Sequence, residues 1–526
     1  MTQEPTGAAA SLPPIATGVS PGGRDAAAPA LCRAEVFAAL PSPWPEDLRP
    51  QIRAMVASQP QHKLVVLDDD PTGTQTVYDV PVLTVWDVET LRAEFAQPGP
   101  CFYILTNSRS LTPDATAELN REIALNLKGA AASLPPVSTE NKHGGKDAAA
   151  PFTVVSRSDS TLRGHFPLET DVLAEELGPF DATVLIPYFE AGGRYTINDV
   201  HYVAEGDRLV PAAETPFAKD AAFGYRHSNL REWVEEKTGG NVRAADVHSI
   251  SIEDLRTAAS SHEATQAVTA KLLALPRGSV CVVNAAHPRD MEFFALAALT
   301  AERAGARFLY RTAAQFVAAR LGMGASVSQP PGLSESADAA GRLGSRPSGL
   351  IVVGSYVPKT TEQLARLLEQ TDVERVELDV EALLDASRRD DVITAALAQT
   401  RAALNAGRDV VVFTSRKLIT GTDAPRSLDI GRQVSDALVA LVQRLDVRPR
   451  FLIAKGGITS SDLATRGLGV KRAMVLGQLL PGIPVWRLGA EAKFPGLDYV
   501  VFPGNVGGPD ALAQAVETLR SKKGES

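Results

Sequence analysis

The sequence predicts two α/β domains whose mostly parallel sheets face each other across a cleft. Short apolar runs alternate with amphipathic stretches of helical period, which is typical of βαβ units. A stretch rich in Gly, Ser and Ala at 323–348 divides two such series. The chain has 526 residues, 44% of them hydrophobic, which is enough for two sizeable cores.

The two series define the expected domains, 61–322 and 349–526, joined by the linker 323–348. The expected strands of the first domain are Leu64–Asp68, Phe102–Thr106 and the runs that begin at Phe152, Ala182 and Val280, with helices at Pro113–Lys128 and Asp290–Ala304. The expected strands of the second begin at Leu350, Val410, Phe451, Pro484 and Tyr499, with helices from Lys359, at Ser427–Leu445 and at Gly508–Lys522. Strands that alternate with helices in this order predict mostly parallel sheets.

Residues 1–60 and 129–151 contain related low-complexity segments, since Gly7–Pro14 recurs at Gly129–Pro136. These segments are rich in Ala, Pro and Gly and lack large apolar residues, so they cannot bury a core. We therefore interpret 1–60 as an N-terminal extension that is partly of low complexity, and 129–151 as an insert in a surface loop.

The composition excludes several classes of protein. With 53 Lys and Arg against 62 Asp and Glu, the formal charge of −9 argues against a nucleic-acid partner, which needs a positive surface. Three cysteines are too few for a disulfide framework. The sequence shows no basic-then-apolar leader and no run of about 18 apolar residues. It therefore predicts a cytoplasmic protein without a membrane partner.

Three consecutive carboxylates, Asp68, Asp69 and Asp70, follow the first buried strand. Like charges in one place raise one another's pKa values, and in open α/β sheets ligands bind at this end of the strands. The functional interpretation makes Asp69 or Asp70 the general base for a hydroxyl, and the other a partner of the substrate or of Mg²⁺. The alternative is a solvated acidic turn that caps the next helix.

Two further loops carry arginines beside short polar residues. The loop after the strand at Phe152 reads SRSDSTLRGHF, and the loop after the strand at Ala182 contains Gly-Gly-Arg. Arginine forms bidentate pairs with carboxylates, and short polar side chains order the hydroxyls of a ligand. Alternatively, Asp159 or Ser160 merely caps a helix. The candidate substrate-binding residues are Arg157, Asp159, Ser160, Thr161, Arg163, Gly193 and Arg194.

Glycine-rich turns precede helices three times in the second half. The sequence has no P-loop motif, and no G-x-G-x-x-G lies between a strand and a helix. Glycine turns at helix starts nevertheless present unpaired N–H groups to an anion, so three of them in one domain favour a nucleotide. The candidate cofactor-binding residues are Ser355, Gly456, Gly457, Ile458, Thr459, Gly504, Asn505 and Gly507.

Over residues 62–520, apart from the insert and the linker, these motifs resemble the four-carbon acid sugar kinase family. The resemblance is carried by Asp69–Gly73, Asp159–Gly164, Gly193–Thr196, Gly354–Ser355, Gly456–Ser460 and Gly504–Gly507. It implies a sugar-acid-binding N-terminal domain, an ATP-binding C-terminal domain, and phosphorylation of the terminal hydroxyl of an acid such as erythronate, threonate or 3-oxo-tetronate. The chain departs from the family's usual residues at Pro71, Thr74, His165, Ile458 and Ser461.

We therefore expect an ATP-dependent kinase of a small sugar acid, with Asp69 or Asp70 as the base and Mg²⁺ bridging the phosphates. The choice of acid and its stereochemistry, the metal ligands and homo-oligomerisation are left open. Two other functions are kept as alternatives. A non-catalytic sugar-acid sensor would not consume ATP, and a hydroxy-acid dehydrogenase would need a dinucleotide fingerprint that the sequence does not show.

Overall fold

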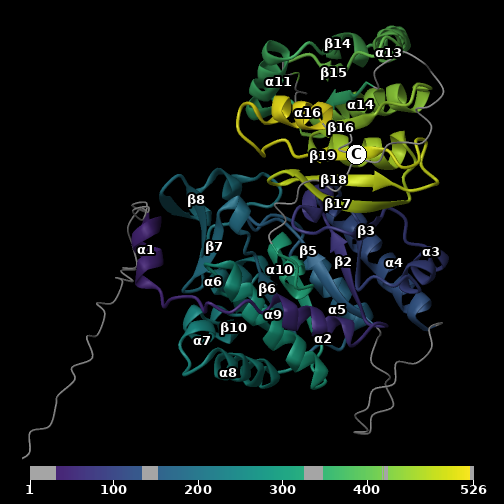
Figure 1. The fold of residues 1–526 in the computed structure, drawn as a ribbon. Helices are drawn as coiled ribbons and strands as arrows, with labels where there is room; N and C mark the ends of the chain where they lie inside the picture. The colour runs from purple at the N-terminus through teal and green to yellow at the C-terminus, as the bar shows by residue number, and fades with distance from the viewer. Residues whose placement is uncertain (1–30, 133–151, 325–347, 417–418, 420–423, 522–526) are drawn as a thin grey trace, which may run out of the picture.

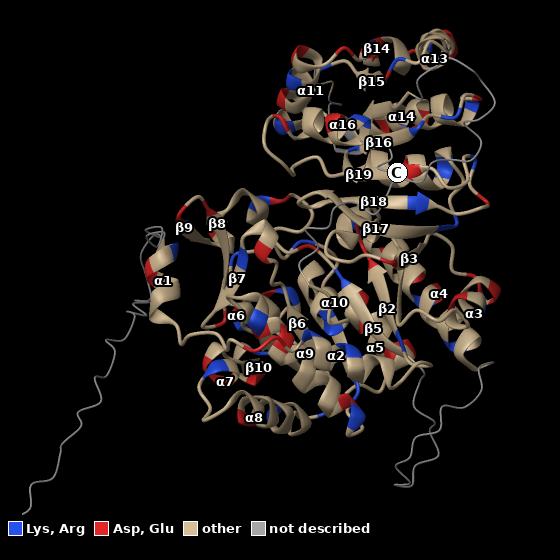
Figure 2. Ribbon diagram, in the orientation of Figure 1, with Lys and Arg blue, Asp and Glu red and all other residues tan. Residues whose placement is uncertain are grey.

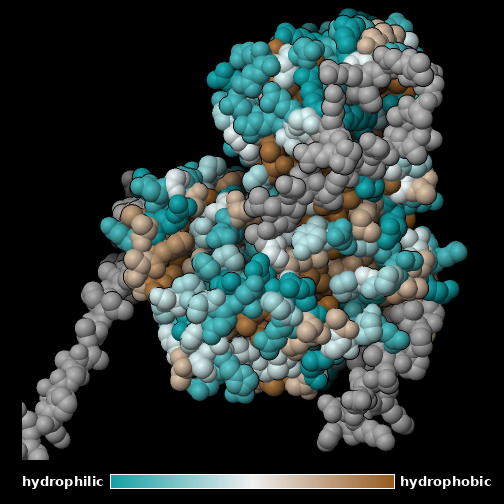
Figure 3. All heavy atoms as spheres, viewed as in Figure 1, coloured by the Kyte–Doolittle hydropathy of each residue, from teal (hydrophilic) through white to brown (hydrophobic). Residues whose placement is uncertain are grey.

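The computed structural model describes residues 31–132, 152–324, 348–416, 419 and 424–521. Much of the expected extension, insert and linker lies outside these residues. The chain forms an N-terminal and a C-terminal part, each with a sheet between helices (Figure 1). Hydrophobic residues show at the surface between the two parts (Figure 3). Within the described ranges, no helix is long and apolar enough to cross a membrane.

The sheet of the N-terminal part is parallel, with the strand order β10-β11-β6-β12-β5-β2-β4-β3. Its strands are β2 (Lys63–Asp68), β3 (Val80–Leu83), β4 (Cys101–Leu105), β5 (Phe152–Arg157), β6 (Ala182–Ile186), β10 (His248–Ile250), β11 (Ser279–Val283) and β12 (Phe308–Thr312). Every residue of β2 is buried, with Leu64 and Val66 in one core and Val65 and Leu67 in another. Because both faces are covered, the central strands are mostly apolar, with charged residues at their ends, as in β2 and β5.

Helices of the N-terminal part cover both faces of its sheet. One core includes α3 (Val88–Phe95), α4 (Pro113–Ala132) and α5 (Leu168–Leu177). The other includes α2 (Arg49–Ala57), α7 (Ile252–Arg256), α8 (Ser261–Leu273), α9 (Pro288–Arg303) and α10 (Ala314–Arg320). The helix α4 runs four residues beyond its expected end, into the segment that we interpreted as an insert.

A small antiparallel sheet, in the order β1-β9-β8-β7, lies beside the main sheet and was not expected from the sequence. Its strands are β1 (Leu31–Cys32), β7 (Arg194–Ile197), β8 (Val200–Glu205) and β9 (Arg208–Pro211), and α1 (Arg33–Ala39) and α6 (Leu230–Lys237) complete the N-terminal part. This sheet places Arg194 at the start of β7.

The C-terminal part continues the order as β17-β18-β19-β16-β13-β15-β14, parallel from β19 to β14. Its strands are β13 (Leu350–Val353), β14 (Glu374–Leu378), β15 (Val410–Thr414), β16 (Phe451–Lys455), β17 (Arg472–Leu480), β18 (Ile483–Leu488) and β19 (Asp498–Phe502). Its helices are α11 (Pro358–Gln370), α12 (Val380–Leu384), α13 (Arg389–Asn405), α14 (Ala424–Arg444), α15 (Gly457–Asp462) and α16 (Ala511–Ser521). Because α11 and α16 share one core and α13 and α14 another, both faces are covered here too.

The two sheets join edge to edge. The strand β3 pairs antiparallel with β17, so that one 15-stranded sheet runs through both parts. An ion pair of 2.8 Å between Arg472 Nε and Glu94 Oε2 crosses the same junction. The junction sets the carboxyl ends of the N-terminal strands beside the C-terminal part (Figure 1).

Candidate active site

The candidate site begins at the carboxyl ends of β2, β4 and β5, which are neighbours in the parallel sheet. Each strand delivers charged residues at this edge: 68–70 from β2, Arg109 after β4 and Arg157 from the end of β5. Figure 2 shows acidic and basic residues close together where these strands end. The parallel register thus gathers residues that lie up to 89 positions apart in the chain.

Asp68 lies inside this cluster. Its side chain is buried, and Arg157 Nη1 lies 3.0 Å from its Oδ1. Burial raises the pKa of Asp68 to about 7, against the opposing effect of the Arg157 charge. A Cβ at Gly73 would lie 2.1 Å from the Asp68 carboxylate oxygens, so glycine is required in the turn η1 (Pro71–Thr74).

Asp69, one of the two candidate bases, has both carboxylate oxygens engaged. Arg109 donates from Nη2 to Oδ1 at 2.5 Å and from Nε to Oδ2 at 3.1 Å. Ser158 Oγ donates to Oδ2 at 2.7 Å. The side chain is 2% exposed. The bidentate pair therefore fixes Arg109 and leaves Asp69 little room to accept a proton.

Asp70, the other candidate base, is the carboxylate of this turn that reaches the surface, with 23% of its side chain exposed. Its Oδ1 accepts hydrogen bonds from the N–H and the hydroxyl of Thr72 at 2.8 and 2.5 Å, so it caps η1. Although burial opposes ionisation, Arg109 and Thr72 hold the pKa of Asp70 below its usual value. The capping contacts involve Oδ1, and Oδ2 lies 3.5 Å from Arg109 Nη1.

Arg109 is a candidate that the sequence reasoning missed. It lies in η2 (Ser108–Ser110), and its guanidinium contacts Asp69, Asp70 and, at 3.9 Å, Asp159. Its position in the sequence could have identified it. Arg109 lies in the loop after the apolar run of β4, just as the other candidate residues lie in the loops after β2 and β5. The rule that ligands bind at this edge of a parallel sheet would have found it.

Arg157, which we expected among the substrate-binding residues, lies within the cluster. Its side chain is 5% exposed, and Nη1 lies 3.0 Å from Asp68 and 3.7 Å from Asp69. Within the described residues its Nε has no hydrogen-bond partner. These contacts make Arg157 a counter-ion of the acidic turn.

The loop after β5 packs closely against the acidic turn. Arg163 Nε donates to Asp159 Oδ2 at 2.7 Å, and the Thr161 hydroxyl donates to the same oxygen. Although burial opposes it, the charges of nearby arginines lower the pKa of Asp159. Gly164 has a φ of 117°, and a Cβ there would lie 2.8 Å from Ser158 Oγ. Only glycine fits this conformation and this contact.

Arg163 and Arg194 share one aromatic ring. Their guanidinium carbons lie 5.1 and 5.4 Å from the centroid of Phe217. Burial lowers the pKa of Arg194, and its Nε has no hydrogen-bond partner among the residues that the structure describes. Gly193, with a φ of 73°, leads into β7, and a Cβ there would lie 3.0 Å from Ala204 Cβ. Two cations with an unused donor suit an anionic ligand.

Ser160 and Thr161 are held through their backbone carbonyls. His201 Nε2 lies 2.8 Å from the Ser160 oxygen, and Tyr225 donates to the Thr161 oxygen at 2.8 Å. Burial lowers the pKa of His201 to about 4, so the imidazole is neutral and donates from Nε2. Its Nδ1 accepts a hydrogen bond from Thr196 Oγ1 at 3.0 Å. His201 is therefore a structural residue of this loop.

A small pocket lies beside Arg163. Its lining residues are Ser158, Asp159, Leu162, Arg163, Leu185, Pro187, Trp233, Arg311 and Thr312. Two of them, Trp233 and Thr312, carry a buried Nε1 and a buried Oγ1 with no partner in the described part of the chain. Apolar walls with a few polar groups are typical of small-molecule sites.

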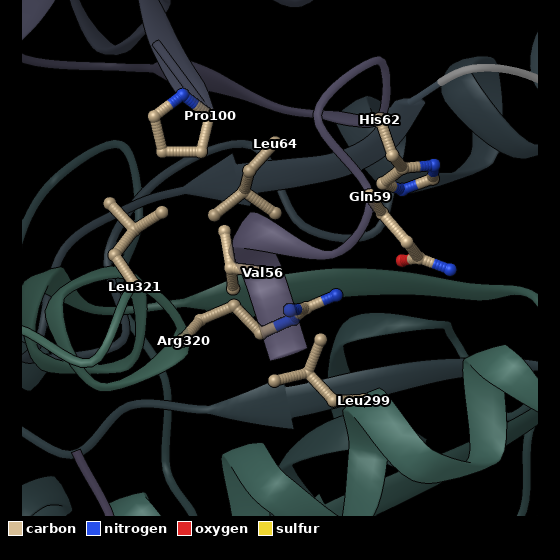
Figure 4. A pocket seen from close by; sticks show the side chains of 8 residues that line it. All are labelled: Val56, Gln59, His62, Leu64, Pro100, Leu299, Arg320 and Leu321. Atoms are coloured by element: carbon tan, nitrogen blue, oxygen red, sulfur yellow. The ribbon is translucent and has the colours of Figure 1, made fainter. Parts of the chain in front are cut away.

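A second pocket lies at the opposite edge of the sheet, near the start of β2. Figure 4 shows mostly apolar side chains there with His62, Gln59 and Arg320. Arg320 forms an ion pair with Glu302, and His62 Nε2 lies 2.9 Å from Thr153 Oγ1. This pocket is separate from the charged cluster, so we do not include it in the candidate site.

In the C-terminal part, three loops meet at the carboxyl ends of β13, β16 and β19. Thr360 Oγ1 lies 3.2 Å from Ser355 Oγ and donates to the Gly504 carbonyl at 3.1 Å. A Cβ at Gly456, where φ is 121°, would lie 3.0 Å from Ser355 Cβ. A Cβ at Gly504 would lie 3.2 Å from Ser355 Oγ. Glycines thus permit a close approach of the loops. The N–H groups of Ser355 and Gly456 bond to the Lys455 and Phe502 carbonyls, so an anion would use other N–H groups of these loops.

The remaining candidates of the C-terminal part lie on the same loops. Ile458 is 60% exposed, so it presents an apolar side chain without a carboxylate. Asn505 is exposed, whereas Thr459 is buried and its Oγ1 would lie 2.3 Å from a Cβ at Gly354. Gly507 has a φ of 85°, and a Cβ there would lie 2.5 Å from Ala511 Cβ.

The acidic turn and the glycine loops meet at the junction of the two parts. A Cβ at Gly457 would lie 3.3 Å from Asp70 Oδ2. Trp486 Nε1 donates to Thr74 Oγ1 at 3.0 Å, which ties η1 to β18. The candidate residues of both halves therefore border one site.

A magnesium ion would find little preformed protein coordination here. The described residues contain no group of three or more His, Cys, Asp or Glu side chains that could hold a metal ion. Mg²⁺ commonly keeps several waters and takes one or two carboxylates together with the phosphates of a substrate. The acidic turn offers such carboxylates, so the residues present fit an ion that arrives with a nucleotide.

Two family models match most of the chain. Residues 64–320 match a model described as a sugar-binding N-terminal domain, and residues 350–512 match a nucleotide-binding C-terminal domain. A comparison with curated protein sequences gave no match.

Several solved structures match this chain. The Haemophilus influenzae protein HI1011, of family DUF1537, is 18% identical, with 87% of this chain and 100% of that chain covered and a TM-score of 0.57. A Salmonella typhimurium LT2 protein named "putative tRNA synthase" is 17% identical, with coverages of 86% and 98% and a TM-score of 0.61. A Bordetella bronchiseptica DUF1537 protein, solved as a domain-swapped dimer with bound citrate, is 21% identical, with coverages of 88% and 99% and a TM-score of 0.35.

Proposed function

The chain belongs to the four-carbon acid sugar kinase family, and from this premise we propose that it is an ATP-dependent kinase of a short sugar acid. The observation that carries the proposal is the approach of Asp70 in the acidic turn to Gly457 in a glycine loop. This contact supports transfer between a ligand of the N-terminal part and a nucleotide of the C-terminal part. Phosphoryl transfer needs alignment, charge neutralisation and a proton acceptor rather than covalent chemistry.

The sugar acid would bind beside Asp159, Arg163 and Arg194. Its carboxylate would pair with the two guanidiniums over Phe217, and its hydroxyls would donate to the Asp159 carboxylate. Arg194 Nε and the buried polar atoms of the adjoining pocket would gain hydrogen bonds from the ligand. Unpartnered buried polar groups favour such a ligand because leaving them unpaired costs about 1–3 kcal/mol each.

Asp70 would accept the proton of the attacking hydroxyl. We choose it over Asp69 because Asp69 is held through both oxygens, whereas the capping contacts of Asp70 involve Oδ1 and leave Oδ2 toward Gly457. A lowered pKa keeps Asp70 ionised, and it accepts the proton as the hydroxyl becomes acidic during transfer. Arg109 would neutralise the charge of the transferred group.

ATP would bind to the loops at Ser355, 456–459 and 504–507. Apart from those of Ser355 and Gly456, which bond to backbone carbonyls, the N–H groups of these loops suit phosphate oxygens, and the glycines permit a close approach. When bound, Mg²⁺ would neutralise phosphate charge, with phosphates and water as most of its ligands and Asp70 as the partly exposed carboxylate of the turn beside it. The exposed Ile458 would border the site without contributing a metal ligand.

A screen of ADP release over four-carbon acids tests the proposal. Erythronate, threonate and 3-oxo-tetronate would be supplied in both configurations with ATP and Mg²⁺, and a three-carbon hydroxy acid would serve as the length control. We expect turnover with at least one four-carbon acid. Acid binding without any ADP release would favour the sensor, and reduction of a nicotinamide cofactor would favour the dehydrogenase.

A further inference from the structure

Lys455 is a fully buried cation next to the candidate nucleotide loops. It is the last residue of β16 and comes directly before Gly456. Its Nζ donates to the carbonyl oxygens of Pro503 at 2.5 Å and of Gly504 at 3.2 Å, and lies 4.1 Å from the centroid of the Phe502 ring. The ammonium therefore holds the turn at 502–504 through three successive residues.

Lys455 also connects this turn with the other two loops. Its carbonyl oxygen accepts a hydrogen bond from the Ser355 N–H at 3.3 Å, and the next residue, Gly456, donates to the Phe502 oxygen at 2.8 Å. The Gly504 carbonyl has a second donor, Thr360 Oγ1, at 3.1 Å. One side chain and its backbone thus link all three loops that form the candidate nucleotide site.

An ammonium in this place is energetically unfavourable. Burial, together with the charge of Lys359, lowers the pKa of Lys455 to about 7. A methionine would fill a similar volume without a charge to desolvate, and replacing buried charges by apolar groups is often neutral or stabilising. What distinguishes Lys455 is its place: its ammonium contacts the turn at 502–504, so its charge lies beside loops that suit an anionic ligand.

We propose that Lys455 is a positioning residue for the nucleotide, which fixes the turn at 502–504 and places a positive charge behind the loops that bind the triphosphate. This inference rests on the proposed function, and it identifies the phosphate-bearing end of the nucleotide as the group that the loops recognise. Because Lys455 is fully buried, it acts through the loop and through its field rather than by touching the ligand.

The chain supplies a matched control in Lys63. This lysine is also buried, and its Nζ also donates to two backbone carbonyls, those of Gln97 and Gly99. It begins β2, whereas the candidate site lies where β2 ends. Lys63→Met therefore removes a buried lysine and its carbonyl contacts without touching the site.

The test measures MgATP binding by calorimetry for the wild type, Lys455→Met, Lys63→Met and Thr360→Val, together with steady-state kinetics. We expect Lys455→Met to weaken MgATP binding about 10-fold, and Thr360→Val about 3-fold, because each removes a donor to the Gly504 carbonyl. Lys63→Met should stay within about twofold. In Lys455→Met the KM for ATP should rise while the KM for the sugar acid is unchanged.

The outcomes separate this inference from the function on which it rests. A wild type that does not bind MgATP overturns the proposed function and this inference with it. If the wild type binds MgATP and Lys455→Met binds it within twofold of the wild type, only the role of Lys455 is overturned. An equal loss of MgATP binding in Lys63→Met overturns that role as well. Should Lys455→Met not fold, Thr360→Val decides, and unchanged MgATP binding in that variant contradicts the inference.

Discussion

The two sides of the candidate site are built by different means. On the N-terminal side, charged side chains form the site: the acidic turn pairs with Arg109 and Arg157, and Arg163 and Arg194 share Phe217. On the C-terminal side, glycine turns bring backbone groups together. A short acid with several hydroxyls is recognised by a few directional side chains, whereas phosphates are bound well by backbone N–H groups.

This difference predicts how each side responds to substitution. The N-terminal side should be sensitive to the removal of one charge, even when the shape of the side chain is kept. The C-terminal side should be sensitive to the addition of a single carbon where a glycine is closely packed. Acid should also act on His201 of the N-terminal side and on Lys455 of the C-terminal side in different ranges of pH.

The largest effect is expected from Asp70→Asn, which keeps the shape of the side chain and removes the proposed base. We expect kcat to fall about 10²–10⁴-fold, with ATP binding measured without Mg²⁺ within about twofold of the wild type. Asp87→Asn is the control, because Asp87 caps α3 through the N–H and the hydroxyl of Thr90 as Asp70 caps η1 through Thr72. Full activity of Asp70→Asn, or an equal loss in Asp87→Asn, would contradict the assignment.

The second effect is the loss of stability in acid that comes from His201 on the N-terminal side. The pKa of His201 is about 4 in the folded chain against an ordinary 6.5, so between these values the unfolded chain binds the proton and the folded chain does not. As the pH falls from 6.5 to 4, His201 should remove about 3 kcal/mol from the free energy of unfolding.

Asp68, whose pKa is raised to about 7, gains stability as the pH falls through the same window. The His201 loss is therefore measured as the difference in pH dependence between the wild type and His201→Asn, by urea unfolding at pH 7 and pH 4.5. The pKa of the C-terminal Lys455 is about 7 in the folded chain against an ordinary 10.5. Its protonation therefore changes the free energy of unfolding above pH 7 and not between pH 4 and 6.5. A pH dependence that is the same in His201→Asn would rule out His201 as its source.

The third effect concerns the sugar acid. Arg194→Ala should raise the KM for the acid about 30-fold, because a hydrogen bond to a charged group contributes roughly 2 kcal/mol, and it should leave the KM for ATP unchanged. Arg226→Ala is the control, since Arg226 is 83% exposed in its side chain and pairs only with Glu236 at 3.3 Å among the described ion pairs. A rise in the KM for ATP alone would place Arg194 on the wrong side of the site.

The smallest effect is expected from one added carbon on the C-terminal side. Gly456→Ala should weaken MgATP binding about 10-fold, because the new Cβ would lie 3.0 Å from Ser355 Cβ and 3.2 Å from Thr459 Oγ1. Gly469→Ala is the control, because Gly469 also has a positive φ but its added Cβ would meet nothing within 4 Å. Equal binding by both variants would mean that the packing of the glycine loops does not matter for the nucleotide.

The strands that were predicted are those buried on both faces. The run at Leu64–Asp68 is β2 with one more residue, and the expected helices at Asp290–Ala304 and Ser427–Leu445 are α9 and α14 within a few residues. The strand β3 was missed because Pro81 interrupts a short run, and proline argues against a strand in sequence. The strands β7, β8 and β9 carry exposed or half-exposed residues, so no apolar run marked them.

The candidate site followed from a rule of position more than from motifs. Polar loops after apolar strands were sufficient to select the acidic turn and the glycine loops. Arg109 was missed because a single arginine in a loop without glycine gives no pattern. Lys455 was missed because a charged residue at the end of an apolar run is normally read as the start of a loop. The choice between Asp69 and Asp70 depended on Arg109 and Gly457, which lie far away in the sequence.

The pairing of β3 with β17 restricts how the halves of this molecule can move. Four residue pairs form a backbone ladder between them, from Val80 with Val475 to Leu83 with Arg472. Separating the two parts at this junction would break the hydrogen bonds between β3 and β17. A change in the twist of the continuous sheet would keep them. Entry and exit of small molecules should therefore accompany a small change in the twist of the continuous sheet, with β3 and β17 still paired.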